Sequence, residues 1–190
     1  MSENGGFRIE GATRSYILRP WIGQQFKWEK LRIMVHGDSY YAEPSGANSM
    51  EAWRLAADSG TIEGETENQI ADTIGAYESG AEDSNSRNLR DAQLYQGVVK
   101  AISGKCPITS DDVKSVFGRI AFNNYVHVPM QSGSTVPTME QYQVGAGVYT
   151  DELARLKPHL SLVFARRVWN NLPKWGQKSS GWEYPRHVAL

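Results

Sequence analysis

Short apolar runs alternate along this chain of 190 residues with stretches whose apolar residues recur every three or four positions. The apolar runs predict strands over 31–36, 120–126 and 160–165. The helical spacing predicts helices over 49–57, 86–103, 110–117, 142–156 and 166–172. Strands that alternate with helices favour a parallel sheet covered on both faces. We therefore expect an α/β fold, a three-layer α/β/α sandwich with a mainly parallel central sheet of about four strands.

Two stretches depart from this alternation. Residues 1–30 are aromatic-rich and irregular, and we expect Trp21, Phe26 and Trp28 to fold back over the sheet. Residues 60–83 are acidic and punctuated by glycines, which predicts an insertion or a flexible lid. Because a chain of this length is most simply one domain, residues 1–190 are expected to form a single domain.

Composition narrows the class of protein. A single cysteine, Cys106, excludes an internal disulfide and is typical of a reducing cytoplasm. The chain has no basic apolar signal segment, and no apolar run of about 18 residues. No cysteines and histidines cluster at the spacing of metal ligands, so the sequence indicates neither a metal nor a cofactor. We expect a cytoplasmic monomer without a membrane partner.

The net charge of −1 hides a segregation of charge along the chain. From Arg155 to the end there are seven lysines and arginines against Glu183 alone, and from Glu51 to Asp91 acidic residues dominate. A basic region on a nearly neutral protein is compatible with local binding of a phosphate backbone, although an ordinary solvated surface has the same composition.

Candidate chemistry begins where the first predicted strand ends. The apolar run 31–36 stops at Gly37, and Asp38, Ser39, Tyr40 and Tyr41 follow. In open α/β sheets, ligands bind outside the carboxyl ends of the strands. The five residues 37–41 are therefore expected to form a site loop.

The triplet Gly37-Asp38-Ser39 is similar to the block that opens the SGNH (GDSL-like) hydrolases, in which the serine is the nucleophile. That resemblance implies an ester hydrolase with Ser39 as nucleophile, and it requires a base within hydrogen-bond reach. The late candidate for the base is His187, but no aspartate stands at the spacing of the family's Asp-x-x-His block.

Three segments in order resemble the uracil-DNA glycosylase superfamily. Gly37-Asp38-Ser39-Tyr40-Tyr41 after a strand resembles its first motif, and Ile120-Ala121-Phe122-Asn123-Asn124-Tyr125-Val126 resembles a second strand that ends in asparagine. Residues 156–173, LKPHLSLVFARRVWNNLP, are similar to the helix, strand and helix that follow. The resemblance spans residues 31–173. It implies a monofunctional DNA glycosylase that hydrolyses the N-glycosidic bond of uracil or of a modified pyrimidine, and the acidic stretch leaves room for a bulky cytosine of phage DNA.

The resemblance also implies roles for individual residues. Asp38 would stabilise a cationic sugar or position water, with Ser39 and His36 as further catalytic candidates. Asn124 would read the base edge from the pocket that Asp38 faces. Further substrate-binding candidates are Gly37, Tyr40, Tyr41, Trp53, Asn123 and His127, with Trp53 as the residue that stacks on the base. Candidates for the DNA backbone are Arg166, Arg167, Lys174 and His187.

The chain departs from this superfamily at several positions. Tyr40 stands where the branch has histidine, and Asp38 where it has glutamate. The superfamily carries a His-Pro-Ser-like loop after a further strand, and Pro185-Arg186-His187 is the group that would replace it. A glycosylase fold that binds DNA or protein without catalysis therefore stays open as an alternative. So do core roles for Trp53 and His36, and ordinary strand-end roles for Asn123 and Asn124.

Overall fold

The computed structural model describes residues 6–42, 49–78, 89–131, 135–173 and 186–189. Five strands form one sheet in the order β1-β3-β2-β4-β5. These strands are β1 (Trp21–Ile22), β2 (Ile33–Tyr41), β3 (Ala121–Met130), β4 (Leu160–Val163) and β5 (Arg186–Ala189). The four strands β3, β2, β4 and β5 are parallel to one another, and β1 is antiparallel to β3 at one edge. The mainly parallel sheet expected from the sequence is confirmed.

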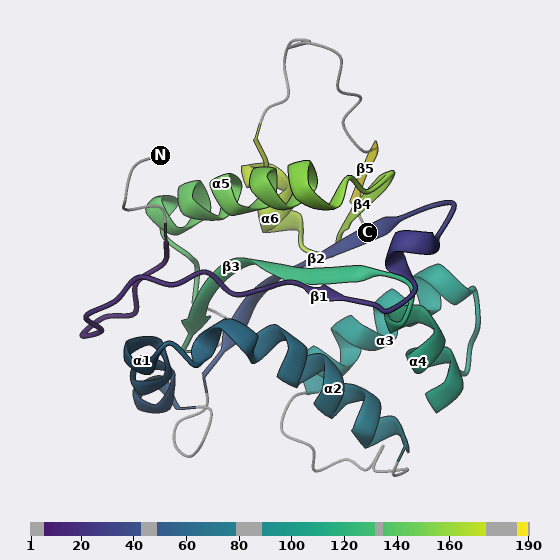
Figure 1. The fold of residues 1–190 in the computed structure, drawn as a ribbon, viewed down its shortest axis with the longest axis horizontal. Helices are drawn as coiled ribbons and strands as arrows, with labels where there is room; N and C mark the ends of the chain where they lie inside the picture. Colours follow the sequence, from purple (N-terminus) through teal and green to yellow (C-terminus); the bar gives the residue numbers. More distant parts are fainter. Residues whose placement is uncertain (1–5, 43–48, 79–88, 132–134, 174–185, 190) are drawn as a thin grey trace.

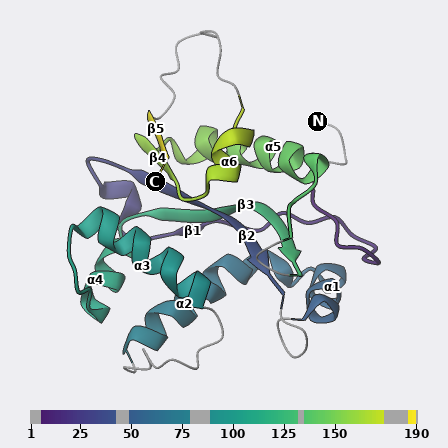
Figure 2. The same ribbon diagram turned by 180° about the vertical axis from the view of Figure 1, so that it is seen from behind.

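Helices cover both faces of this sheet, which makes the three layers of an α/β/α sandwich (Figure 1, Figure 2). One face carries α5 (Met139–Leu156) and α6 (Arg166–Asn171), and the other carries α2 (Glu65–Glu78), α3 (Leu89–Ser103) and α4 (Ser110–Phe117). Helix α1 (Met50–Ser59) lies beside α2, and two short 3-10 helices span Phe26–Trp28 (η1) and Ile62–Gly64 (η2).

Two apolar cores correspond to the two faces. Alternate residues of β2 point to opposite sides, so Met34 packs in the core that contains Tyr149 and Leu153 of α5, while Val35 packs in the core of α3 and α4. Helix α5 approaches the sheet closely at Gly145, where an added Cβ would lie 2.5 Å from the carbonyl oxygen of Tyr125. Glycine at this position therefore lets backbone pack on backbone.

Strand β2 is longer than the apolar run that predicts it. It continues from Ile33 to Tyr41, so the expected site loop 37–41 is strand. The physical reason is the length of its neighbour, because β3 pairs with β2 from Ala121 as far as Met130. The pairing shifts register between Ser39 and Tyr41.

The stretch 60–83, expected to be an insertion or a lid, is largely helical where the structure describes it. Residues 65–78 form helix α2, and residues 79–83 lie outside the described residues. Ile62, Thr66 and Ile70 are at most 2% exposed and recur every fourth position, so they attach this acidic segment to the body of the protein.

One smaller expectation also needs correction. Trp28 does not fold over the sheet, because its side chain is 85% exposed, whereas Phe26 is buried as expected. Helix α4 is capped by Thr109, through a reciprocal pair of hydrogen bonds between Thr109 and Asp112.

Candidate functional site

The strand order defines one place where loops diverge. In the sheet, β2 and β4 are neighbours, with β3 on the far side of β2 and β5 on the far side of β4. The connections that follow β2 and β4 therefore run in opposite directions, toward β3 and toward β5. In open α/β sheets, such a switch point between two adjacent strands is where ligands bind. Strand β4 ends at Val163, opposite His36, so among the described strands none pairs with the β4 side of β2 from Gly37 onward.

Asp38 lies on this open edge and is held by groups from two elements. Its Oδ2 accepts hydrogen bonds from the guanidinium of Arg167, which is in α6, and from the Tyr41 hydroxyl at 3.4 Å. Arg167 also donates to the Tyr41 hydroxyl at 3.0 Å and to the carbonyl oxygen of Thr135 at 3.1 Å. The side chain of Asp38 is 15% exposed and that of Arg167 is 28% exposed. One carboxylate oxygen is therefore fixed while the whole group stays close to the surface.

The other oxygen of this carboxylate has no such partner. Asp38 Oδ1 is buried without a hydrogen bond to any described residue, and the same is true of the Tyr142 hydroxyl in α5. Burial raises the pKa of Tyr142, and the negative charge of Asp38 raises it further. Burial works against the charge of Arg167, but its bonds to Asp38 outweigh that effect and raise its pKa. A buried oxygen without a partner costs about 1–3 kcal/mol, so these two atoms are suited to a polar ligand.

A second group of polar atoms lies on the opposite face of the sheet. Asn124 pairs with Gly37, and its Oδ1 lies so close over Gly37 that no Cβ would fit there. Leu94 of α3 lies against the same point, at 3.0 Å from the position of such a Cβ. Asn124 Oδ1 and Ser39 Oγ are both buried and lack hydrogen-bond partners in the described part of the chain. From the sequence, Asn124 is expected on the side of Asp38, but the strand register places it on the other side.

Asn123 shares the face of Asp38, and its amide is fully engaged. Its Nδ2 donates to Glu152 Oε1 at 2.6 Å, and its Oδ1 accepts from the Tyr40 hydroxyl at 3.2 Å and from the Asn124 backbone N–H at 2.9 Å. The Tyr40 hydroxyl also bonds to Thr66 Oγ1 at 2.5 Å. Burial raises the pKa of Glu152 to about 8. Asn123 therefore joins α5, the sheet and α2, which favours a structural role.

Four further candidates lie in the interior, namely His36, Tyr40, Trp53 and His127. His36 is 1% exposed and packs edge-on against Tyr149, with ring centroids 4.6 Å apart. Trp53 is 4% exposed and packs against the buried ring of Tyr40 at 5.5 Å. His127 is 1% exposed, and its Nδ1 accepts from the Leu18 backbone N–H at 2.9 Å. These contacts place Trp53 and His127 in the core rather than at the Asp38 centre.

The candidates for DNA backbone contact divide into three cases. Arg166 is exposed at the start of α6, whereas the guanidinium of Arg167 is bound to Asp38. Lys174 lies outside the described residues. His187 is in β5, paired with Ser161, and only its backbone is described.

For the hydrolase alternative, no described side chain is bonded to Ser39 as a base. Ser39 is 4% exposed, and its Oγ has no hydrogen bond to a histidine or to any other residue that the structure describes. Activation of a serine hydroxyl needs such a bond. The described geometry therefore gives no support to Ser39 as a nucleophile.

Sequence reasoning missed three members of these clusters. Tyr142 and Glu152 belong to the helix predicted over 142–156, but nothing in the local pattern distinguishes them from other residues of its buried face. Thr66 lies in the stretch expected to be a lid, where the recurrence of Ile62, Thr66 and Ile70 at every fourth position was the available signal.

Comparisons with known proteins add no relative. No family model matches the chain, and no curated protein matches it. Within the described ranges, no three histidines, cysteines, aspartates or glutamates gather in a group that could hold a metal ion. None of the described helices is long and apolar enough to cross a membrane.

Proposed function

We propose that this protein is a monofunctional DNA glycosylase, related to the uracil-DNA glycosylase superfamily, that hydrolyses the N-glycosidic bond of uracil or of a modified pyrimidine. Water adds to C1′ of the sugar, the base leaves, and an abasic site remains. The observation that carries the proposal is Asp38, whose Oδ2 is fixed by Arg167 and Tyr41 and whose buried Oδ1 has no partner among the described groups.

This arrangement suits the chemistry of the reaction. The transition state carries positive charge at the sugar, and a fixed carboxylate stabilises such a charge without having to reorganise. Because Arg167 and Tyr41 hold Oδ2, the free Oδ1 is the atom that would face C1′ or orient the attacking water.

Recognition of the base would use the second polar group. Asn124 Oδ1 lies over Gly37, while Asp38, the next residue of β2, points to the other face of the sheet. A nucleotide extruded into this edge could place its sugar at Asp38 and its base at the amide of Asn124. Asn123 is the less suitable reader, because its amide is already bonded to Glu152 and Tyr40.

The proposal fits a cytoplasmic monomer that meets DNA directly, and exposed Arg166 is its candidate contact to the DNA backbone. A bulky modified cytosine, as in phage DNA, is a substrate to include beside uracil, which separates a defence enzyme from a repair enzyme.

The test is base release from defined oligonucleotides. Single- and double-stranded DNA containing uracil, hydroxymethylcytosine or glucosylated hydroxymethylcytosine is incubated with the protein, and alkali then cleaves at abasic sites. We expect release from at least one of these bases, and Asp38→Asn should lower the rate by about 100-fold or more.

Ser39→Ala is the matched control for that variant. It removes a buried oxygen without a hydrogen-bond partner from the neighbouring position, so base release should stay within a few-fold of the parent protein. Equal losses of base release in the two variants would count against a glycosylase. Binding of DNA without release of any base in the panel would also count against it, and would favour a binding module of the same fold.

A further inference from the structure

An exposed tryptophan lies shortly before the start of β2, whereas Asp38 lies in the second half of that strand. Trp28, the last residue of η1, is 85% exposed, and Leu31 close to it is 53% exposed. An exposed apolar patch that polar residues surround indicates an interaction site. We define the Trp28 surface by Trp28, Leu31 and the cationic side chains of Lys27, Lys30, Arg32 and Lys157.

The segment that presents the indole is held firmly. Phe26, two positions before Trp28, is 1% exposed. The backbone N–H of Gln25 donates to the Gly118 carbonyl oxygen at 2.8 Å, and the Arg32 guanidinium donates to the Lys157 carbonyl oxygen at 2.7 and 3.1 Å. The indole is therefore presented by a fixed backbone, which lowers the entropy lost when a ligand binds.

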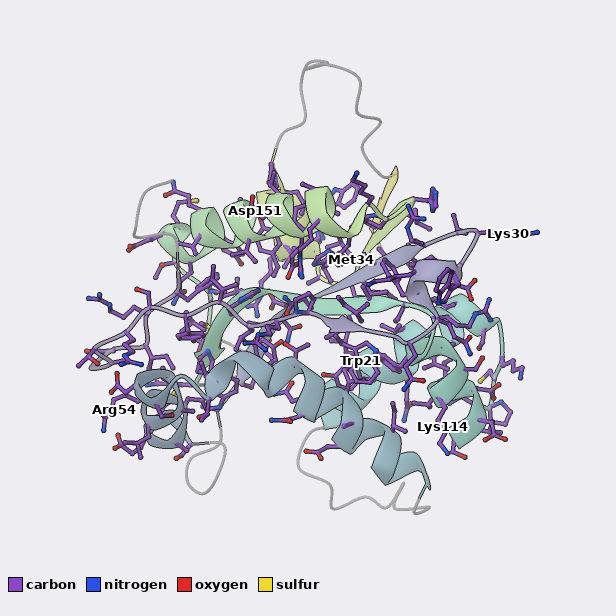
Figure 3. The ribbon with its side chains drawn as sticks, in the orientation of Figure 1. Trp21, Lys30, Met34, Arg54, Lys114 and Asp151 are labelled. Carbon is purple, nitrogen blue, oxygen red and sulfur yellow. The ribbon has the colours of Figure 1, made fainter. Side chains whose placement is uncertain are left out.

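The exposed charges of the Trp28 surface are positive. Lys27, Lys30 and Lys157 are exposed, and Lys30 projects away from the body of the molecule just before β2 (Figure 3). The single acid between positions 27 and 32 is Glu29, and it is paired with Arg119 at 2.8 Å. A partner that complements this surface must combine negative charge with a flat face for the indole.

We propose that the Trp28 surface binds a single strand of nucleic acid, with one base stacked on Trp28 and the flanking phosphates near Lys27, Lys30 and Lys157. Aromatic side chains set in a basic surface are the general means by which proteins hold unpaired strands. A duplex fits less well, because its bases already stack on one another. The inference goes beyond base excision, since it requires a strand but no particular base.

The Trp28 surface is separate from the site around Asp38. Arg32 and Asp38 are six residues apart along an extended strand, which corresponds to about 20 Å. The two sites can therefore be tested independently of one another.

The experiment uses two fluorescein-labelled strands of 12 units, oligo-dT and an abasic strand of the same length, and follows their binding by anisotropy. Oligo-dT offers bases and phosphates, whereas the abasic strand offers phosphates alone. Trp28→Leu should weaken binding of oligo-dT by about tenfold and binding of the abasic strand by less than twofold. Because Trp28 is so exposed, the midpoint of urea unfolding should not change.

Charge is tested with a matched pair of substitutions. Lys30→Glu should weaken binding of both strands and reduce the dependence of affinity on salt. Lys100→Glu, which reverses an exposed lysine of α3, should do neither. The proposal is overturned by unchanged oligo-dT binding in Trp28→Leu, by equal losses on both strands, or by self-association of the parent protein that Trp28→Leu abolishes. Anisotropy reports binding of a strand and not release of a base, so these results are independent of the excision assay.

Discussion

At the scale of single residues, Gly37 decides how two polar groups are arranged around one strand. Its lack of a side chain leaves room for Asn124 Oδ1 on one face, and Asp38 follows on the other. Glycine is therefore required here for the close approach of a neighbouring side chain and not for a turn.

Gly37→Ala should lower the free energy of unfolding by about 1–3 kcal/mol, because the new methyl group meets Asn124 Oδ1 and Leu94 Cδ2 in a packed interior. Adding Asn124→Ala should restore most of this loss, since it removes the obstructing oxygen. Asn124→Ala alone should cost little, because Oδ1 has no partner in the described structure. Urea unfolding of the four proteins measures the coupling. Strictly additive effects would mean that the two residues do not contact one another as described.

At the scale of elements, α5 is joined to the sheet by a buried polar network. Glu152 is 5% exposed, and Asn123 links it to Tyr40 and Thr66. Such a network fixes the position of the helix only while all of its groups are satisfied.

Glu152 gives this network a dependence on pH. Its folded-state pKa of about 8 lies above the ordinary value of 4.5, mainly because of burial. Its contribution to stability is therefore fully present below about pH 4.5 and is lost as the pH rises through about 8. Glu152→Gln should remove this loss, so that the free energy of unfolding falls less between pH 5 and 8 than in the parent protein. Glu140→Gln, in the exposed first turn of the same helix, serves as the control. Parallel pH profiles for the parent and Glu152→Gln would show that the carboxyl group is ionised in the folded state.

Helical periodicity predicts elements well where one face is continuously apolar. The helices expected over 110–117, 142–156 and 166–172 correspond to α4, α5 and α6 with ends within three residues. Strand β5 was not predicted, because Arg186–Ala189 has no alternating pattern and its pairing with β4 is a tertiary contact. Asp38 could be chosen from the sequence, but its partner Arg167 is 129 positions away, and no local pattern connects the two.

At the scale of the whole molecule, the segment before β1 is part of the folded core. Phe7 stacks on His127 with ring centroids 4.9 Å apart, and the Tyr16 hydroxyl donates to the His127 carbonyl oxygen at 2.8 Å. The aromatic-rich beginning of the chain thus packs on β3, and His127 is one of its polar attachments.

His127 should make the protein sensitive to acid. Burial lowers its pKa to about 3 from the ordinary 6.5, so its contribution to stability is fully present above about pH 6.5 and is lost as the pH falls toward 3. Because His127 lowers stability as the pH falls and Glu152 lowers it as the pH rises, we expect a broad maximum of stability between about pH 4.5 and 6.5. His127→Asn keeps an acceptor for the Leu18 N–H but does not titrate, so its acid limb should be shallower. Substitution of the exposed His159 by Asn is the control, and an acid limb that stays unchanged in His127→Asn would assign it to other groups.

The central position of β2 has a consequence for synthesis on the ribosome. β2 comes early in the chain, yet both of its neighbours in the sheet come much later, and Arg32 and His159 at its β4 side are 127 positions apart. At about 5–20 residues per second, the ribosome needs about 6–25 seconds to add that length. For most of this interval the segment 33–36 has neither neighbouring strand, and after β3 has been added it still lacks β4, so the nascent chain should depend on chaperones until β4 has emerged.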